Sequence, residues 1–262
     1  MNTKSSLPTE KRALAAVAHP DDIEFMMAGT MLELRRAGWE IHFWNLANGC
    51  CGSMETGREE TASIRAREAA AAAAMAGATW HEPLFDDLSV LYDAPSLAKV
   101  CAVIRQVKPA LILTHSPSDY MEDHQNVCRL VVTAAFSKGI PNFVTEPPSP
   151  HAACPVRIYH ALPHGLRDGL GRPVIPDCYV DVGGVMETKR ELLACHESQN
   201  KWLDATQGMD AYLDEMSRMC AEMGKMSGGF DFAEGLLRHS HLGFCPPDYD
   251  PLARDLAVLS GA

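Results

Sequence analysis

The first half of the chain alternates between short apolar runs and longer helix-forming segments, and this pattern strongly constrains the fold. Short apolar runs bounded by polar residues or proline are typical of buried strands. We expect strands at residues 13–17, 40–46, 80–85 and 110–114. We expect helices at residues 24–36, 58–76, 96–107 and 124–137. Strand–helix alternation indicates βαβ units. We therefore predict an α/β fold, with a Rossmann-like, mostly parallel sheet and helices on both faces.

The second half of the chain has a different character. Residues 141–155 are rich in proline and are expected to form a loop. Later strands are expected at 156–162 and 178–182, and helices at 185–196 and 211–224. The tail, 227–262, is rich in Gly, Pro and His, and we expect it to be ordered only by packing on the body. We predict one domain over 1–262, with an N-terminal arm (1–12) and a helical and irregular C-terminal extension (201–262).

Composition narrows the classes of partner. The chain has 262 residues, of which 47% are hydrophobic and 22% charged, as is usual for globular proteins. Its formal net charge is -11, and no cluster of Lys and Arg offsets it, which argues against nucleic-acid binding and against an anionic membrane surface. No apolar run approaches the roughly 20 residues that a membrane-spanning helix needs. The nine cysteines form no Cys-x-x-Cys pair, so we expect a reduced, cytoplasmic setting.

The run His19-Pro20-Asp21-Asp22 lies between the first expected strand and the first expected helix. In open α/β sheets, ligands bind outside the carboxyl ends of the strands. Catalytic zinc keeps three protein ligands and one position for water, and His19 and Asp22 supply two of them. The strand at 110–114 ends next to His115 and is followed by His124, and spacing alone leaves both as candidates for the third.

Several motifs together make the chain similar to a known family. The family motif Ala-His-Pro-Asp-Asp-Glu stands here at 18–22, with Ile23 before the glutamate, and His-Pro-Asp-His stands as Met-Glu-Asp-His at 121–124. Arg-x-x-Glu appears at 65–68, and Lys189 precedes a His-x-Ser-Gln motif at 196–199. Across roughly residues 13–200, the chain resembles the PIG-L/LmbE-like family of zinc-dependent N-deacetylases.

The resemblance implies roles for individual residues. It makes His19, Asp22 and His124 the ligands of one Zn²⁺ per chain, Asp21 the general base and Arg65 a substrate contact. The implied reaction is the removal of an acetyl group from an N-acetylglucosamine-type sugar or glycoconjugate, a small-molecule substrate. Members of the family often form trimers or hexamers, so the resemblance also implies a homo-oligomer.

Met121 departs from the family pattern. The family has a histidine here that stabilises the oxyanion or donates a proton, and a methionine side chain can do neither. The candidates for a replacement are Tyr120, His160, His164 and His196, and we favour the segment that carries His160 and His164. We expect Tyr120 and His164 to contact the substrate.

Three other interpretations stand beside this one. An Asp before a helix is often only an N-cap, although the fixed His-Pro sequence argues against that interpretation for Asp21 and Asp22. Met121 keeps open a non-catalytic, metal-dependent carbohydrate-binding protein. A dinucleotide-binding oxidoreductase is disfavoured because no Gly-x-Gly-x-x-Gly follows the first strand.

The adjacent Cys50 and Cys51 are interpreted as part of a plain loop rather than as a reactive thiol pair.

Overall fold

The computed structural model describes residues 11–200 and 211–261. An eight-stranded sheet forms its centre, in the order β3-β2-β1-β4-β5-β7-β6-β8. The strands are β1 (Arg12–Val17), β2 (Glu40–Asn45), β3 (Thr79–His81), β4 (Leu111–Thr114), β5 (Arg157–Ala161), β6 (Cys178–Asp181), β7 (Ala233–Arg238) and β8 (Val258–Ser260). The pairs that join β3, β2, β1, β4 and β5 are all parallel. The predicted α/β class with a mostly parallel sheet is confirmed.

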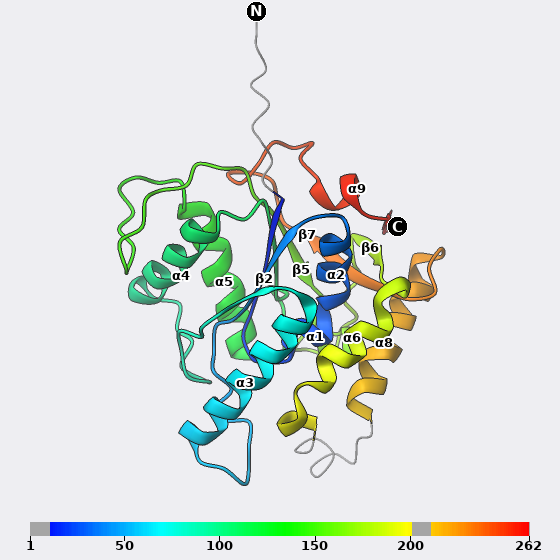
Figure 1. Ribbon diagram of the computed structural model, residues 1–262. Coiled ribbons are helices and arrows are strands. Elements are labelled where there is room, and N and C mark those ends of the chain that lie inside the picture. Colours follow the sequence, from blue (N-terminus) through cyan, green and yellow to red (C-terminus); the bar gives the residue numbers. More distant parts are fainter. Residues whose placement is uncertain (1–10, 201–210, 262) are drawn as a thin grey trace, which may run out of the picture.

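Helices cover both faces of the sheet (Figure 1). They are α1 (Asp22–Met26), α2 (Ala28–Arg36), α3 (Arg58–Ala76), α4 (Ala94–Val107), α5 (Glu122–Ser137), α6 (Met186–Ala194), α8 (Ala211–Ser227) and α9 (Pro251–Asp255), with 3-10 turns η1 (His164–Leu166) and η2 (Gly183–Val185). Side chains alternate along β1, so that Ala13 and Ala15 join the core under α2 and α6, whereas Leu14 and Ala16 join the core under α4 and α5. This two-faced burial explains why β1 reads as a continuous apolar run.

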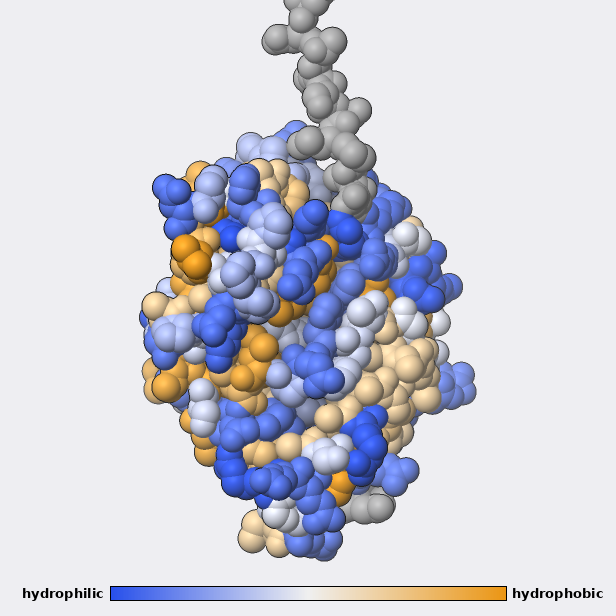
Figure 2. All heavy atoms as spheres, turned by 60° about the vertical axis from the view of Figure 1, so that its left-hand side comes forward, coloured by the Kyte–Doolittle hydropathy of each residue, from blue (hydrophilic) through white to orange (hydrophobic). Residues whose placement is uncertain are grey.

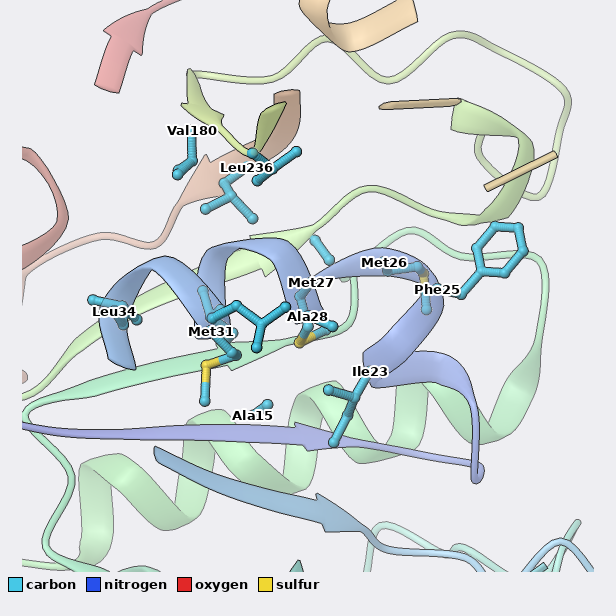
Figure 3. Packing of buried hydrophobic residues seen from close by; sticks show 14 of the residues in the cluster. Ala15, Ile23, Phe25, Met26, Met27, Ala28, Met31, Leu34, Val180 and Leu236 are labelled. Atoms are coloured by element: carbon cyan, nitrogen blue, oxygen red, sulfur yellow. The ribbon is translucent and has the colours of Figure 1, made fainter. Parts of the chain in front are cut away.

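The helix expected at 24–36 is divided into α1 and α2 at Met27, whose backbone is not helical (φ -146°, ψ 1°). Figure 3 shows the side chains around this break, with Met27, Ala28 and Met31 packed near Ala15 of β1. The cause lies far away in the sequence. The Glu234 carboxylate of β7 accepts hydrogen bonds from the backbone N–H groups of Gly29 (2.8 Å) and Thr30 (2.7 Å), and so caps a new helix start.

The C-terminal part of the chain differs from the expected helical and irregular extension. Strand β7 lies inside the sheet, antiparallel to both β5 and β6, and β8 adds the edge strand next to β6. The segment therefore completes the sheet instead of only packing on its outside. Of the expected N-terminal arm, residues 1–10 lie outside the described part of the chain.

The surface mixes hydrophilic and hydrophobic residues, as the face in Figure 2 shows. Hydrophobic residues appear there in several separate patches. Among the described residues, no helix is both long enough and apolar enough to cross a membrane.

The Glu234 carboxylate also pairs with the ammonium group of Lys189, and both side chains are buried. Because Glu234→Ala removes the cap of α2 and leaves a buried cation unpaired, we expect it to lower the free energy of unfolding by roughly 3–5 kcal/mol. Glu222→Ala, which breaks a more exposed pair with Arg218, should cost less than about 1 kcal/mol. Urea denaturation of both variants measures this, and equal losses would contradict the structural role of Glu234.

Candidate metal and catalytic site

The candidate site lies where two neighbouring parallel strands end. β1 pairs with β2 on one side and with β4 on the other. In open α/β sheets the crevice outside the carboxyl ends of the strands at such a point binds ligands. The turn after β1 carries His19 and Asp21 and leads into Asp22, the first residue of α1. The loop after β4 carries His115 and leads into α5, whose first turn carries His124. The order of the strands therefore brings together two motifs that are about a hundred residues apart in the sequence.

His19, Asp22 and His124 each offer a ligand atom, and these atoms lie within 4.8 Å of one another. The Asp22 Oδ2 atom is 3.6 Å from His19 Nδ1 and 3.4 Å from His124 Nε2. Two imidazole nitrogens and a carboxylate oxygen are a donor set typical of catalytic zinc sites, in which a fourth position holds water or substrate.

Two further carboxylates orient the two histidines. Asp123 Oδ2 lies 3.1 Å from His19 Nε2, and Asp119 Oδ1 lies 3.1 Å from His124 Nδ1. Each ring therefore directs its other nitrogen toward Asp22. His124 Nε2 is buried and has no hydrogen-bond partner among the described residues. Metal-ligating histidines almost always give their second nitrogen to such a carboxylate, so this cluster fits a bound divalent cation.

The electrostatics favour a cation at the same place. Burial disfavours the charged form of His124, but the carboxylates of Asp22 and Asp119 outweigh burial and raise its pKa to about 10. Burial alone would raise the pKa of Asp22, but His124 and His115 hold it well below its usual value. The negative field that retains a proton on His124 Nε2 also attracts a divalent cation to that nitrogen.

His115, the rival third ligand, also places its Nε2 atom 3.4 Å from Asp22 Oδ2, but this nitrogen has another partner. Its Nε2 atom accepts a hydrogen bond of 2.7 Å from the backbone N–H of Ala18, which uses the lone pair that a metal would need. Its ring stacks on the ring of His124, with centroids 3.9 Å apart and planes 8° apart. Burial lowers the pKa of His115 to about 4, so the ring is neutral. This geometry favours His115 as a support for the first turn and for His124.

Asp21 lies beside the cluster and is held by other groups. Its φ of 98° is rare for a residue with a side chain, and such backbone strain is concentrated at functional sites. Its side chain makes no capping hydrogen bond to α1, so it is not a simple N-cap. Its carboxylate accepts hydrogen bonds from Arg65 Nη2 (3.1 Å) and from the Tyr212 hydroxyl. Burial raises the pKa of Asp21, and Arg65 opposes this shift.

Arg65 is only 4% exposed and lies under the loop that follows β2. A Cβ atom added to Gly49 or Gly52 would lie 2.6 Å from the Arg65 side chain, so Arg65 would have to move if either residue were larger. Besides Asp21, Arg65 Nη2 donates to the Pro20 carbonyl. The structure therefore places Arg65 where it holds the 20–21 turn. One helical turn further along α3, the Glu68 carboxylate accepts a hydrogen bond from the backbone N–H of Ser198 (2.8 Å). This bond joins the Arg-x-x-Glu motif to the His-x-Ser-Gln motif.

The candidates for the missing histidine lie in different surroundings. Tyr120 is 53% exposed, and its ring meets the edge of His124 at 5.8 Å. His164 packs on Phe25 at 4.9 Å. Desolvation by the surrounding protein lowers the pKa of His164, although the residue is exposed, and nearby carboxylates, Glu215 first and then Asp22, oppose this effect. Tyr120 therefore contacts a residue of the metal-ligand cluster. His164 contacts Phe25, three residues after Asp22.

His160 and His196 are placed differently. His160 Nδ1 donates to the His115 carbonyl (2.8 Å), and its Nε2 accepts from His239 Nδ1 (2.9 Å), so neither nitrogen is available to a substrate. His196 is fully buried with its Nε2 atom 3.3 Å from Glu24. Of the two histidines in the favoured segment, the geometry supports His164.

The buried His160 makes stability depend on pH. Burial lowers its pKa to about 4, whereas an unfolded histidine has a pKa of about 6.5. Between these values the unfolded chain binds more protons, so this group makes stability fall as the pH falls from 6.5 toward 4. In His160→Asn a side-chain amide, which does not titrate, replaces the ring donor. As the pH falls from 6.5 toward 4, the wild type should therefore lose stability relative to the variant. A difference independent of pH in urea titrations would contradict this.

Comparison with known proteins matches part of the chain to a family model. A family model described as "PIG-L: GlcNAc-PI de-N-acetylase" matches residues 14–135. The chain carries a PIG-L family domain. This domain spans the strands β1 to β4 and nearly all of α5, and so contains every residue of the metal-ligand cluster. The resemblance predicted from the motifs is confirmed.

The similarity to two curated relatives extends over more of the chain than this PIG-L domain. The diacetylchitobiose deacetylase of Thermococcus kodakarensis is 27% identical over 251 residues, which cover 90% of this chain and 86% of the relative. The 4-oxalmesaconate hydratase of Pseudomonas putida is 26% identical over 204 residues, with 72% and 74% covered. The two relatives are therefore named for different reactions.

Solved structures share the fold. The 4-carboxy-2-hydroxymuconate hydratase of Pseudomonas putida has a TM-score of 0.74 and 22% identity over 92% of this chain and 99% of its own. The N,N'-diacetylchitobiose deacetylase of Pyrococcus horikoshii has a TM-score of 0.72 and 20% identity over 91% and 88%. Because both identities are low, these likenesses show that the PIG-L chain has this fold and no more.

The sequence did not predict a role in the site for two residues, Asp119 and Tyr212. Asp119 lies in the loop before α5, and its only sequence signal is that it is a carboxylate near a candidate ligand, a residue type that commonly orients ligating histidines. Tyr212 gives no signal at all, because it lies on α8 and reaches Asp21 only through the fold.

Proposed function

We propose that the protein is a zinc-dependent hydrolase that removes the N-acetyl group from an N-acetylglucosamine-type sugar or glycoconjugate. The proposal rests on the different surroundings of two adjacent carboxylates, Asp21 and Asp22. Asp22 points at the two oriented histidines, whereas Asp21 points away from them, toward Arg65 and Tyr212. Amide hydrolysis at a metal is helped by a carboxylate that is not bound to the metal and so is free to move a proton.

His19 Nδ1, Asp22 Oδ2 and His124 Nε2 would hold one Zn²⁺ per chain. A zinc ion bound there supplies Lewis-acid polarisation of the amide carbonyl and lowers the pKa of a water toward about 7. Three neighbouring residues would position the ligands. Asp119 and Asp123 fix the ring orientations, and His115 packs against His124.

Asp21 acts as the general base in this proposal. Its carboxylate takes a proton from the attacking water and passes it to the nitrogen of the leaving amine, so that the products are acetate and the free amino sugar. Arg65 and Tyr212 hold the carboxylate in place during both transfers. Because its pKa is raised by burial, Asp21 is a better proton acceptor than an exposed aspartate.

Tyr120 and His164 are proposed as substrate contacts. Tyr120, in the loop after β4, contacts His124, and His164, after β5, packs on Phe25 of α1. Each carries a hydrogen-bond donor that Met121 lacks. His164 is our choice for the group that stabilises the developing negative charge on the carbonyl oxygen. Removal of one such donor typically costs about 10²–10³ in kcat.

The relative named as a hydratase supports a second candidate function, the addition of water to a carbon–carbon double bond. This reaction uses the same kinds of group, a cation that polarises the substrate and a base for water. The net charge of -11 disfavours the polycarboxylate substrate that the hydratase name describes. The identity with the deacetylase extends over more of the chain, 90% against 72%. A purely carbohydrate-binding role is not favoured, because both relatives are named as enzymes.

The two reactions have different products, so a single panel separates them. Zinc-loaded protein is incubated with N-acetylglucosamine, with its β-1,4-linked dimer and with an unsaturated tricarboxylate. We expect equimolar acetate and primary amine from at least one sugar, and no loss of ultraviolet absorbance from the unsaturated acid. Loss of that absorbance without acetate would support the hydratase, and sugar binding without turnover would support the non-catalytic alternative.

A further inference from the structure

We propose that Cys50, Cys51 and Asp87 form a second cation site, for a thiophilic divalent cation such as Zn²⁺ or Cd²⁺. The site lies in the loop that follows β2, which we call the dithiol loop (residues 48–52). Its three ligand atoms lie within 4.8 Å of one another. None of these residues belongs to the His19–Asp22–His124 cluster.

The spacing of the two sulfur atoms fits a shared cation. Cys50 Sγ and Cys51 Sγ are 3.9 Å apart, and both thiols are free. In a disulfide this distance is about 2.05 Å. Two sulfurs on one tetrahedral zinc, each at about 2.3 Å, are about 3.8 Å apart. Side chains of adjacent residues usually diverge, so the loop holds these two in an unusual arrangement that matches the edge of a metal tetrahedron.

Hydrogen bonds to Asp87 and Asn48 hold the dithiol loop in this shape. Asp87 Oδ1 accepts from the backbone N–H of Gly49 (2.7 Å), and Oδ2 accepts from that of Cys51 (2.8 Å). The side-chain oxygen of Asn48 accepts from the backbone N–H of Cys50 (3.1 Å). Each oxygen of Asp87 keeps a second lone pair, so the carboxylate can bind a cation without releasing the loop.

The two sulfurs differ in their surroundings. Arg58 Nη1 lies 3.2 Å from Cys51 Sγ, which belongs to an exposed residue, whereas Cys50 is buried. Arg58 also pairs with Asp86 at 2.9 Å and is exposed, so it can turn toward Asp86 when a cation arrives. Burial raises the pKa of Cys50 to about 11, and a cation must therefore displace the proton of this thiol.

A cation here would also act on the proposed active site, and this part of the inference rests on the proposed function. Gly49 and Gly52 lie against Arg65 so closely that a Cβ on either would displace the Arg65 side chain. Arg65 in turn holds Asp21. A cation bound by Cys50, Cys51 and Asp87 would stiffen the loop backbone that lies against Arg65, so excess zinc should lower the deacetylase rate.

Cadmium binding tests the site without any need for turnover. Protein already loaded with one equivalent of Zn²⁺ is titrated with Cd²⁺, and the thiolate-to-cadmium absorption in the ultraviolet is followed. We expect one further equivalent to bind with this absorption. The absorption should be lost in Cys50→Ser/Cys51→Ser and kept in Cys195→Ser, a partly exposed cysteine on another element.

Cys51→Ser alone changes an exposed side chain, so its folding should be preserved, and we expect it to weaken cadmium binding at least tenfold. An unchanged cadmium titration in Cys51→Ser or in the double variant would overturn the site. Inhibition by excess zinc should disappear in the same variants. Because the cadmium absorption does not depend on catalysis, the site can stand even if the proposed deacetylase activity fails.

Discussion

Asp21→Asn is expected to lower kcat by about two to four orders of magnitude while the protein keeps one bound metal ion per chain. The loss follows from the role of Asp21 as the group that moves the proton, because positioned acid–base groups typically contribute about 10²–10⁴ to the rate. The metal stays because Asp21 points toward Arg65 and Tyr212, away from the ligand atoms. Initial rates of acetate release and metal analysis of the same sample measure both quantities.

Asp86→Asn is the matched control for this variant. Asp86 is an exposed carboxylate that pairs with Arg58 outside the cluster, so the same substitution there should change kcat by less than about twofold. The proposed base would be wrong if Asp21→Asn kept most of its rate. Loss of the metal in Asp21→Asn would make Asp21 a ligand and would contradict the division of labour between Asp21 and Asp22.

His124→Ala is expected to abolish stoichiometric zinc binding and with it the activity, because it removes the one nitrogen of the cluster that is buried without a partner. Asp119→Asn should act more mildly. The amide binds His124 Nδ1 less firmly than a carboxylate does, so we expect zinc affinity to fall ten- to a hundredfold. In the Cys50→Ser/Cys51→Ser background, which lacks the proposed inhibitory site, the activity of Asp119→Asn should return at high zinc, whereas that of His124→Ala should not. Calorimetric zinc titration of the apo protein measures both affinities.

His115→Gln distinguishes the two candidates for the third ligand. The side-chain oxygen of the glutamine reaches the position of Nε2 and can still accept the hydrogen bond from Ala18, so we expect the variant to keep its bound zinc. If His115→Gln lost zinc and His124→Ala kept it, the assignment of the third ligand would be reversed.

Much of the fold was predictable because the local signals agree with the tertiary structure. The helix expected at 58–76 is α3 (Arg58–Ala76), and the apolar run at 13–17 is β1 (Arg12–Val17). Strand β7 was not predictable in this way. Its partners, Tyr159–Ala161 and Cys178–Asp181, are far away in the sequence, and its own residues include a buried glutamate and a glycine. Likewise, no local residue signals the break at Met27, since Glu234 supplies the cap.

The site shows the same limit. Motifs pointed to His19, Asp22 and His124, and the structure brings these three side chains together. Spacing could not decide between His115 and His124, because the lone pair of His115 is used by the backbone of another loop. The contact of Tyr212 with Asp21 depends on how α8 packs on the PIG-L domain, and no pattern within α8 encodes it.

The central claim is that His19, Asp22 and His124 hold a zinc ion beside a free Asp21. Anomalous diffraction at the zinc edge from crystals grown with one equivalent of Zn²⁺ tests this claim most directly. The account predicts one anomalous peak at about 2.0–2.2 Å from His19 Nδ1, Asp22 Oδ2 and His124 Nε2, with the Asp21 carboxylate outside bonding distance. A peak bonded to Asp21 or to His115, or no peak at this cluster, would contradict it.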